Sequence, residues 1–323
     1  MPKEEILSVK DLHTYFESPG GTVRAIQNIS LSLSKKEVLG IIGESGSGKT
    51  TIGLSIMRLL DRDGHIDKGS ICLEKQDLLS LSESEMRSIR GKDISMTFES
   101  SSSILNPSDS IGGQIRELIQ IHTDLTYKDS NKLILKNLTE IGIQNALKVM
   151  DMQPRELSAR VSQKVMLVMS TILQPKVLIA DEITRNLDII TQAQISDHFR
   201  RKISSTEIST LLLTNDPGIL AQLADTVIVI YKGRKLEQAP VQEIFKRPMH
   251  PYTFHLLRPM ENRKLKTIRS ASRNEPSDPD MCPLVEKCQR AISKCRTSPM
   301  PQDTEFDNDH QVACYNPISV LID

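Results

Sequence analysis

Several features that would place the chain in a membrane, outside the cell or on nucleic acid are absent from its sequence. No apolar run is both long enough and free enough of charge to cross a bilayer. Residues 1–5 do not follow the basic-then-apolar order of a secretory signal. The 41 basic and 41 acidic residues cancel, so no net positive charge favours nucleic acid. We therefore expect an intracellular protein whose contact with any membrane comes through partners.

Cysteine is almost absent from the main part of the chain, and no internal repeat is evident. Cys72 lies alone in a strand-like segment and is expected to pack rather than react. The composition changes after residue 257, because residues 258–280 are basic and then rich in Ser, Pro and Asp, which indicates a linker. The sequence thus predicts a main domain over residues 1–257 and a small C-terminal cysteine module over residues 281–323.

A glycine-rich run between a strand-like segment, 38–42, and a helical pattern, 51–60, is the strongest functional signal. It fits the phosphate-binding pattern GxxxxGK[ST] and consists of Gly43, Glu44, Ser45, Gly46, Ser47, Gly48, Lys49 and Thr50. Glycines let such a loop wrap a phosphate, and backbone N–H groups and the helix N-terminus face the negative charge. We expect Lys49 to reach the β- and γ-phosphates, Thr50 to ligate Mg²⁺, and Thr51 to belong to the same site. The strand before and the helix after favour nucleoside triphosphate binding over a chance Gly/Ser turn.

A second motif would complete such a site. The apolar run 176–180 ends in Asp181 and Glu182. At the end of a buried strand, Asp181 would hold the metal ion through water and Glu182 would polarise an attacking water. An acidic pair can also be a solvated turn, but its coexistence with the glycine-rich run favours the nucleotide site. Apolar segments 210–214 and 226–231 alternate with helical patterns, as expected of an α/β sheet.

These motifs resemble those of the ATP-binding subunits of ABC transporters, and most closely the oligopeptide, dipeptide and nickel importer group. The likeness covers nearly the whole chain. Besides the two motifs above, the matching segments are 187–188, 191–195, 224–227 and 250–253. Family membership implies ATP hydrolysis coupled to transport, with ATP and Mg²⁺ as ligands.

The resemblance also implies a fold. We expect an α/β P-loop NTPase (RecA-like) core with an antiparallel β flap formed by strands near residues 6–33 and 70–74. An α-helical subdomain inserted over about residues 95–170 and the small cysteine-rich extension would complete it. In the family an early aromatic of the flap stacks on adenine, and here Phe16 is preferred over Tyr15.

Three positions depart from the family pattern where the γ-phosphate is sensed. Asn215 stands in place of a switch histidine, and it can hydrogen-bond but cannot carry a positive charge. Glu99 replaces a glutamine and, when ionised, only accepts hydrogen bonds, although it could still ligate Mg²⁺. The signature, which reaches the ATP of the opposite subunit, keeps Ser158 but replaces both glycines with Ala159 and Arg160. We expect impaired or asymmetric hydrolysis.

The resemblance implies partners as well. Two nucleotides lie between two such subunits, so a homodimer would carry every departure twice. We therefore predict a heterodimer with a paralogous ATPase subunit, two transmembrane permease subunits and, indirectly, an extracytoplasmic solute-binding protein. The complex would import peptides, or nickel or another small solute, from the cytoplasmic face of a bacterial inner membrane. The alternative is a catalytically weak regulatory or structural ATP clamp with a redox-responsive cysteine module.

The four remaining cysteines lie in the tail, at Cys282, Cys288, Cys295 and Cys314. Their spacing lacks the close CxxC pairs of most zinc ribbons, and four thiolates also suit an iron-sulfur cluster. The pattern resembles the C-terminal motif of the peptide-importer ATPases, which implies a [4Fe-4S] cluster. Unligated cysteines are the alternative, whereas disulfides are disfavoured in a cytosolic protein.

Overall fold

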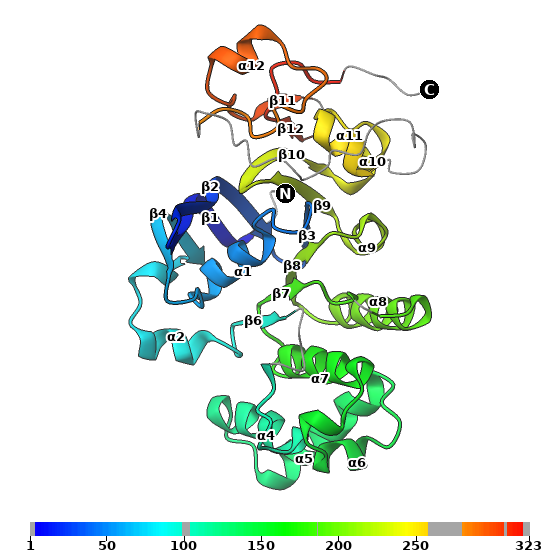
Figure 1. Ribbon diagram of the computed structural model, residues 1–323. Helices are drawn as coiled ribbons and strands as arrows, with labels where there is room; N and C mark the ends of the chain where they lie inside the picture. Colours follow the sequence, from blue (N-terminus) through cyan, green and yellow to red (C-terminus); the bar gives the residue numbers. More distant parts are fainter. Residues whose placement is uncertain (1–3, 99–103, 186, 258–279, 307–308, 319–323) are drawn as a thin grey trace.

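The computed structural model describes residues 4–98, 104–185, 187–257, 280–306 and 309–318, and an eight-stranded sheet runs through its centre (Figure 1). In spatial order the strands are β11 (Thr304–Phe306), β12 (His310–Val312), β10 (Arg234–Pro240), β9 (Thr226–Tyr231), β3 (Val38–Ile42), β8 (Ser209–Thr214), β7 (Val177–Asp181) and β6 (Ile94–Thr97). The strands from β9 to β6 are parallel. Every residue of β3, β7 and β8 is buried, as expected of strands covered on both faces. Their carboxyl ends share one edge, where ligands bind in such sheets.

A second, four-stranded antiparallel sheet forms the predicted flap. Its order is β2 (Gly21–Ser34), β1 (Glu5–Ser18), β4 (Gly64–Leu73) and β5 (Gln76–Asp77). The apolar residues of this sheet share one buried cluster with α1 (Lys49–Met57) and with inward residues of the central strands. Two short elements, η1 (Leu78–Ser80) and α2 (Glu83–Ile89), lead from the flap to β6. The flap is thus fixed to the sheet edge from which α1 starts.

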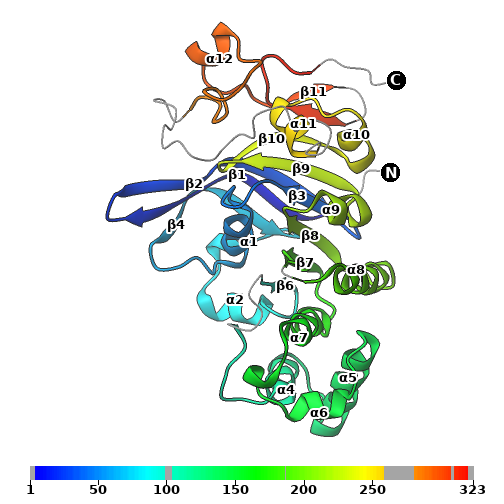
Figure 2. The same cartoon turned by 45° about the vertical axis from the view of Figure 1, so that its right-hand side comes forward.

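The predicted helical insertion lies between β6 and β7, at the end of the molecule opposite the C-terminal segment (Figure 2). It contains α4 (Ile111–His122), α5 (Tyr127–Glu140), α6 (Ala146–Asp151), η2 (Pro154–Glu156) and α7 (Ala159–Thr171). The side chains of Ser110, Thr126 and Ser158 accept backbone hydrogen bonds at the N-termini of α4, α5 and α7. The insertion starts later than the predicted residue 95, because residues 94–97 pair with β7 as a buried strand.

Of the other helices, α8 (Ile189–Ser204) follows β7 and α9 (Pro217–Leu223) follows β8. The helices α10 (Val241–Lys246) and α11 (Pro251–Leu257) come after the antiparallel strand β10, and α12 (Ser293–Thr297) belongs to the C-terminal segment. Among the described residues, no helix combines the length and the apolar character needed to cross a membrane.

The C-terminal segment extends the main sheet, since β12 pairs with β10 and β11 pairs with β12. A buried carboxylate contacts both sides of the junction between β10 and the C-terminal segment. Glu237 of β10 accepts hydrogen bonds from the backbone N–H groups of Met249 and His250, at 2.7 and 2.8 Å, and lies 2.6 Å from Nε2 of His310. Because Glu237 and His310 are fully buried, these contacts fix the C-terminal segment against the main domain.

Candidate functional site

The glycine-rich loop joins β3 to α1 in a conformation that requires glycine at two positions. A Cβ atom at Gly43 would lie 2.3 Å from the carbonyl oxygen of Ile230. At Gly48 the backbone has φ +106°, and a Cβ atom would lie 2.9 Å from the carbonyl oxygen of Ala25. Neighbouring backbone therefore packs directly against the loop at both glycines, and the loop leads straight into the N-terminus of α1.

Lys49 lies inside this loop. Its Nζ atom donates to the carbonyl oxygens of Gly43, at 2.8 Å, and Glu44, at 3.1 Å, and is 3.9 Å from the carboxylate of Glu182. Lys49 and Glu182 are each only 6% exposed. A buried ammonium held at the mouth of a loop of N–H donors provides the charge that a phosphate needs.

Oxygen ligands for a metal ion lie beside the lysine. The Thr50 hydroxyl donates to Oδ2 of Asp181 at 2.8 Å, which joins the start of α1 to the end of β7. The backbone N–H of Asp181 in turn donates to the Thr97 hydroxyl at 3.0 Å. A hydroxyl and a carboxylate are hard oxygen donors of the kind that Mg²⁺ takes beside substrate phosphates. These residues therefore fit a Mg²⁺ ion bound together with ATP.

Glu182 adopts the left-handed region, with φ 47°, as the chain leaves β7. Its backbone N–H donates to the carbonyl oxygen of Leu213 in β8 at 2.9 Å. Burial raises the pKa of the Glu182 carboxyl, while Lys49 and a hydrogen bond from the backbone N–H of Asn215 oppose that shift. Only the backbone of Asn215 reaches Glu182, and the residue is exposed. The contact is therefore independent of which side chain stands at position 215.

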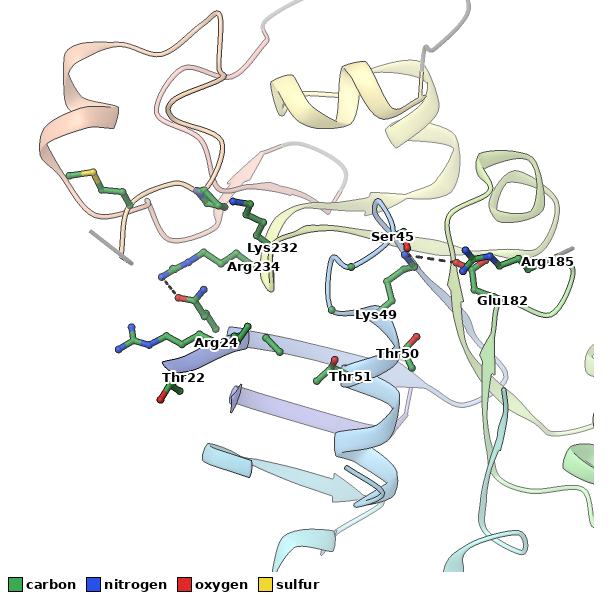
Figure 3. Close-up of a pocket in the computed structure, with 17 residues that line it drawn as sticks. Thr22, Arg24, Ser45, Lys49, Thr50, Thr51, Glu182, Arg185, Lys232 and Arg234 are labelled. Atoms are coloured by element: carbon green, nitrogen blue, oxygen red, sulfur yellow. Dashed lines mark hydrogen bonds and ion pairs between the residues drawn. The ribbon is translucent and has the colours of Figure 1, made fainter. Parts of the chain in front are cut away.

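A cavity of about 720 Å³ opens over the loop (Figure 3). Its lining residues are Thr22, Val23, Arg24, Ala25, Gln27, Ser45, Gly46, Gly48, Lys49, Thr50, Thr51, Glu182, Arg185, Lys232, Arg234, Met281 and Pro283. Among these described residues, five are basic and only Glu182 is acidic. A cavity with this excess of positive charge and a phosphate-binding loop at one end is suited to a polyphosphate.

The structure separates the predicted nucleotide residues into two sets. Those of the loop and of α1 lie in or directly around the cavity, and Asp181 touches it through Thr50. Phe16, predicted to stack on adenine, is not among the lining residues. It pairs with Val23 across the hairpin and packs against Gly64, where a Cβ atom would lie 2.7 Å from its ring. Glu99 lies outside the described residues.

The altered signature lies away from the cavity. Ser158 begins α7, and its hydroxyl accepts a hydrogen bond from the N–H of Val161. The guanidinium of Arg160 lies 2.7 Å from Oδ2 of Asp188, at the start of α8. Hydrogen bonds from Thr191 hold the pKa of Asp188 at about 2. The altered signature segment is thus tied, through Arg160, to a charged residue of α8 in the same chain.

The four C-terminal cysteines converge on one small cavity. Cys282, Cys288, Cys295 and Cys314 all line it and form no disulfide. Burial raises the pKa values of Cys282 and Cys314 to about 11. In the described parts of the chain, no three His, Cys, Asp or Glu side chains are grouped closely enough to hold a metal ion. The structure therefore gathers the predicted ligands without forming a ready metal site.

Comparisons with known proteins agree with this geometry. A model of the ABC transporter family matches residues 26–185, and one of the oligopeptide/dipeptide transporter C-terminal region matches residues 236–295. The dipeptide transport ATP-binding protein DppD of Bacillus subtilis is 36% identical over 318 residues, which cover 97% of this chain and 95% of that protein. The chain belongs to the ATP-binding proteins of ABC transporters.

A second sequence relative and two solved structures are also similar to this chain. The oligopeptide transport ATP-binding protein OppD of Escherichia coli is 33% identical, over 99% of this chain and 95% of its own length. Among solved structures, the dimeric ABC transporter cassette MJ0796 with ADP and Pi has a TM-score of 0.66 at 18% identity, covering 73% of this chain and 99% of that one. CbiO1 of Clostridium perfringens has a TM-score of 0.62 at 23% identity, covering 76% and 92%. These two structures show the fold alone.

The predicted family and the predicted core, flap and helical insertion are thereby confirmed. ABC ATPases hydrolyse ATP in a reaction coupled to transport, so the predicted enzyme class is confirmed as well. The roles of individual site residues and the [4Fe-4S] cluster stay predictions.

Several residues of the ABC nucleotide cavity were missed by the sequence analysis. They are Arg24, Arg185, Lys232, Arg234, Met281 and Pro283. Two of them flank Gly233, at which a Cβ atom would lie 2.2 Å from the carbonyl oxygen of Ala25. The glycine between strand patterns indicates a hairpin turn, but only tertiary packing shows that this turn presses against the flap.

Proposed function

We propose that this ABC ATPase is the ATP-binding subunit of a bacterial peptide importer. The observation that carries the proposal is the near full-length likeness to proteins named for dipeptide and oligopeptide transport, together with the cationic cavity over the glycine-rich loop. Binding and hydrolysis of ATP would move two permease subunits between their inward-facing and outward-facing states. The subunit would lie on the cytoplasmic face of the inner membrane and act on peptides delivered by an extracytoplasmic solute-binding protein.

In this proposal each site residue has a defined role. Lys49 neutralises the β- and γ-phosphates, Thr50 and Asp181 bind Mg²⁺, and Glu182 polarises the attacking water. The buried positions of Lys49 and Glu182 and the direct contact between Thr50 and Asp181 support these roles. The main domain would comprise residues 1–257 and the cysteine module residues 281–323, joined by residues 258–280.

We further propose that hydrolysis is asymmetric and that the second ATPase subunit is a paralogue. The Arg160–Asp188 ion pair supports this, because it holds a bulky side chain within the helix start that would approach the partner's ATP. Backbone N–H groups can approach a phosphate closely only where side chains leave room. At this chain's own ATP, Asn215 supplies no positive charge. A paralogue with an unaltered signature would restore one of the two sites.

The first test compares ATP turnover of the chain alone with that of the chain assembled with its paralogue and permeases. Because a transition-state donor supplied by the partner is worth about two orders of magnitude in rate, we expect turnover per site in the complex to be higher by at least about tenfold. Solute-binding protein loaded with peptide should raise turnover further, whereas nickel should not. Fast hydrolysis by the chain alone would contradict the heterodimer, and stimulation by nickel alone would contradict peptide import.

We also propose that the four cysteines bind a [4Fe-4S] cluster. The donor set fits, because four thiols converge on one cavity from separate parts of the segment. The cavity is only about 20 Å³, so the thiols would have to move apart to admit the cluster. Such a cluster can supply structural linkage or one-electron redox chemistry to the module, and residues Cys282, Cys288, Cys295 and Cys314 would hold it.

Iron binding can be tested without reference to transport. After anaerobic reconstitution with iron and sulfide, we expect visible charge-transfer absorption and about four irons per chain. Cys295→Ser should abolish most of this signal. Cys72→Ser is the matched control, since Cys72 lies in β4 and does not line the cysteine cavity. Equal iron content in the two variants, or stoichiometric zinc in its place, would show that the cluster assignment is wrong.

A further inference from the structure

The ATP cavity has two ends, and the C-terminal segment borders one of them. Figure 3 shows Lys49, Thr50 and Glu182 at one end and Arg24 and Arg234 at the other. If the triphosphate lies on the glycine-rich loop, as the proposed function requires, the nucleoside must extend toward the second end. That end is formed by residues 22–25 and 27 of β2, by Arg234 and by two residues of the C-terminal segment, Met281 and Pro283.

The side chains at this second end are apolar or cationic, apart from the neutral polar Thr22 and Gln27. Among the described residues that line the cavity none is aromatic, and the apolar ones there are Val23, Ala25, Met281 and Pro283. A purine ring buried without an aromatic partner can still pack against a polarisable thioether or a flat pyrrolidine ring. Val23 is 56% exposed, so it leaves one apolar surface at this end open to a ligand.

Met281 and Pro283 are held in place from both sides. Preceding them, Asp280 lies 3.6 Å from the guanidinium of Arg234, and its carbonyl oxygen accepts a hydrogen bond from the N–H of Met300 at 2.7 Å. Following them, Leu284 and Val285 are each only 1% exposed. A segment fixed at both ends presents its side chains with little loss of conformational entropy on binding.

Arg234 connects this segment to the flap. Its Nη2 atom donates to Oε1 of Gln27 at 3.1 Å, and its side chain is only 14% exposed. The same guanidinium therefore faces Asp280 on one side and β2 on the other. The planar guanidinium thus joins β2 to the C-terminal segment at the end of the cavity away from Lys49.

We propose that Met281 and Pro283 form a wall of the ATP site that contacts the nucleoside, so that the C-terminal module is part of the nucleotide pocket. This inference rests on the proposed binding of ATP at the glycine-rich loop. The residue between them, Cys282, lines the cysteine cavity instead. In three consecutive residues, Met281 and Pro283 therefore line the ATP cavity while Cys282 lines the cysteine cavity. The proposed nucleoside wall and the cysteine module thus belong to the same stretch of chain.

The test measures the affinity of the full-length protein for ATP and, separately, for inorganic triphosphate by titration calorimetry. Removing an apolar side chain from the wall should remove contacts with the nucleoside and leave contacts with the phosphates unchanged. We expect Met281→Ala to weaken ATP binding by about tenfold and to leave triphosphate binding unchanged. Met281→Leu, which keeps the apolar volume, should restore the affinity for ATP. Met300→Ala is the matched control, because Met300 packs on the core in the same module and does not line the cavity.

The outcomes separate this inference from the proposed function. Unchanged ATP affinity in Met281→Ala, alongside loss of binding of both ligands in Lys49→Ala, would overturn the wall and leave the ATP site intact. Equal weakening of ATP and triphosphate by Met281→Ala would also overturn it, since that would show an effect on the loop rather than on the nucleoside. If the wild-type protein binds neither ligand, the proposed ATP site itself is wrong.

Discussion

Replacing Lys49 with alanine is expected to weaken ATP binding by about two orders of magnitude, because hydrogen bonds to charged groups are worth about 1.5–3 kcal/mol each. The Nζ atom that now donates to the carbonyl oxygens of Gly43 and Glu44 would turn to the phosphates when ATP binds. Among the described residues that line the cavity, Glu182 alone is acidic, and loss of Lys49 would remove a positive charge 3.9 Å from its carboxylate. Titration calorimetry with ATP and Mg²⁺ measures the effect.

A control lysine distinguishes the phosphate-binding role of Lys49 from the loss of one positive charge anywhere on the protein. Lys148 lies exposed on α6 in the helical insertion, far along the chain from the loop, and does not line the cavity. Lys148→Ala should bind ATP as the wild type does. A circular dichroism melt of Lys49→Ala checks that the fold persists, and unchanged ATP affinity in a folded Lys49→Ala protein would refute the proposed phosphate site.

Replacing Glu182 with glutamine is expected to lower ATP turnover of the assembled complex by about a hundredfold, because a positioned general base contributes about 10²–10⁴ in rate. Glutamine keeps the size of the side chain and can still accept the hydrogen bond from the backbone N–H of Asn215. ATP binding should persist, since Lys49, Thr50 and Asp181 are unchanged. Steady-state phosphate release and equilibrium ATP binding, measured on the same preparation, give the two quantities.

The control for this change is Glu117→Gln, an exposed glutamate on α4 that does not line the cavity. It should leave turnover unaltered. If Glu182→Gln also leaves turnover unaltered while ATP still binds through Lys49, hydrolysis belongs to the partner's site or to neither. The subunit would then act chiefly as an ATP-dependent clamp, which is the alternative function.

In the proposals above, the Arg160–Asp188 pair and the wall formed by Met281 and Pro283 would affect different nucleotides. Arg160 would approach the partner's ATP, whereas Met281 borders the cavity over this chain's own loop. An importer built on such a subunit would therefore differ between its two ATP sites for two separate reasons. Exposed ion pairs contribute little to stability, so the effect of Arg160 concerns geometry rather than the strength of the fold.

The sequence by itself determined the phosphate loop, the acidic pair and the alternation of strands and helices. These features are local, because a loop that wraps phosphate needs glycines at fixed spacing, and buried parallel strands need continuous apolar runs. The start of the helical insertion, predicted at about residue 95, was less well determined by the sequence. Residues 94–97 form a segment of only four residues, of which Ile94 and Met96 are apolar, and only pairing with β7 distinguishes a buried strand from a helical segment.

Only the tertiary structure decided what surrounds the nucleotide. Phe16 and Val23 are partners in one hairpin, yet Val23 lines the cavity and Phe16 packs against Gly64. No spacing rule connects Arg234 to Gln27, or Met281 to Lys49, because those pairs are more than two hundred residues apart in sequence. Strand pairing between β10 and β12 and the buried contact of Glu237 with His310 bring the C-terminal segment to the cavity. Contacts of this kind arise from the packing of whole elements. The sequence motifs therefore predict the chemistry of the site, but they do not predict the shape of its cavity.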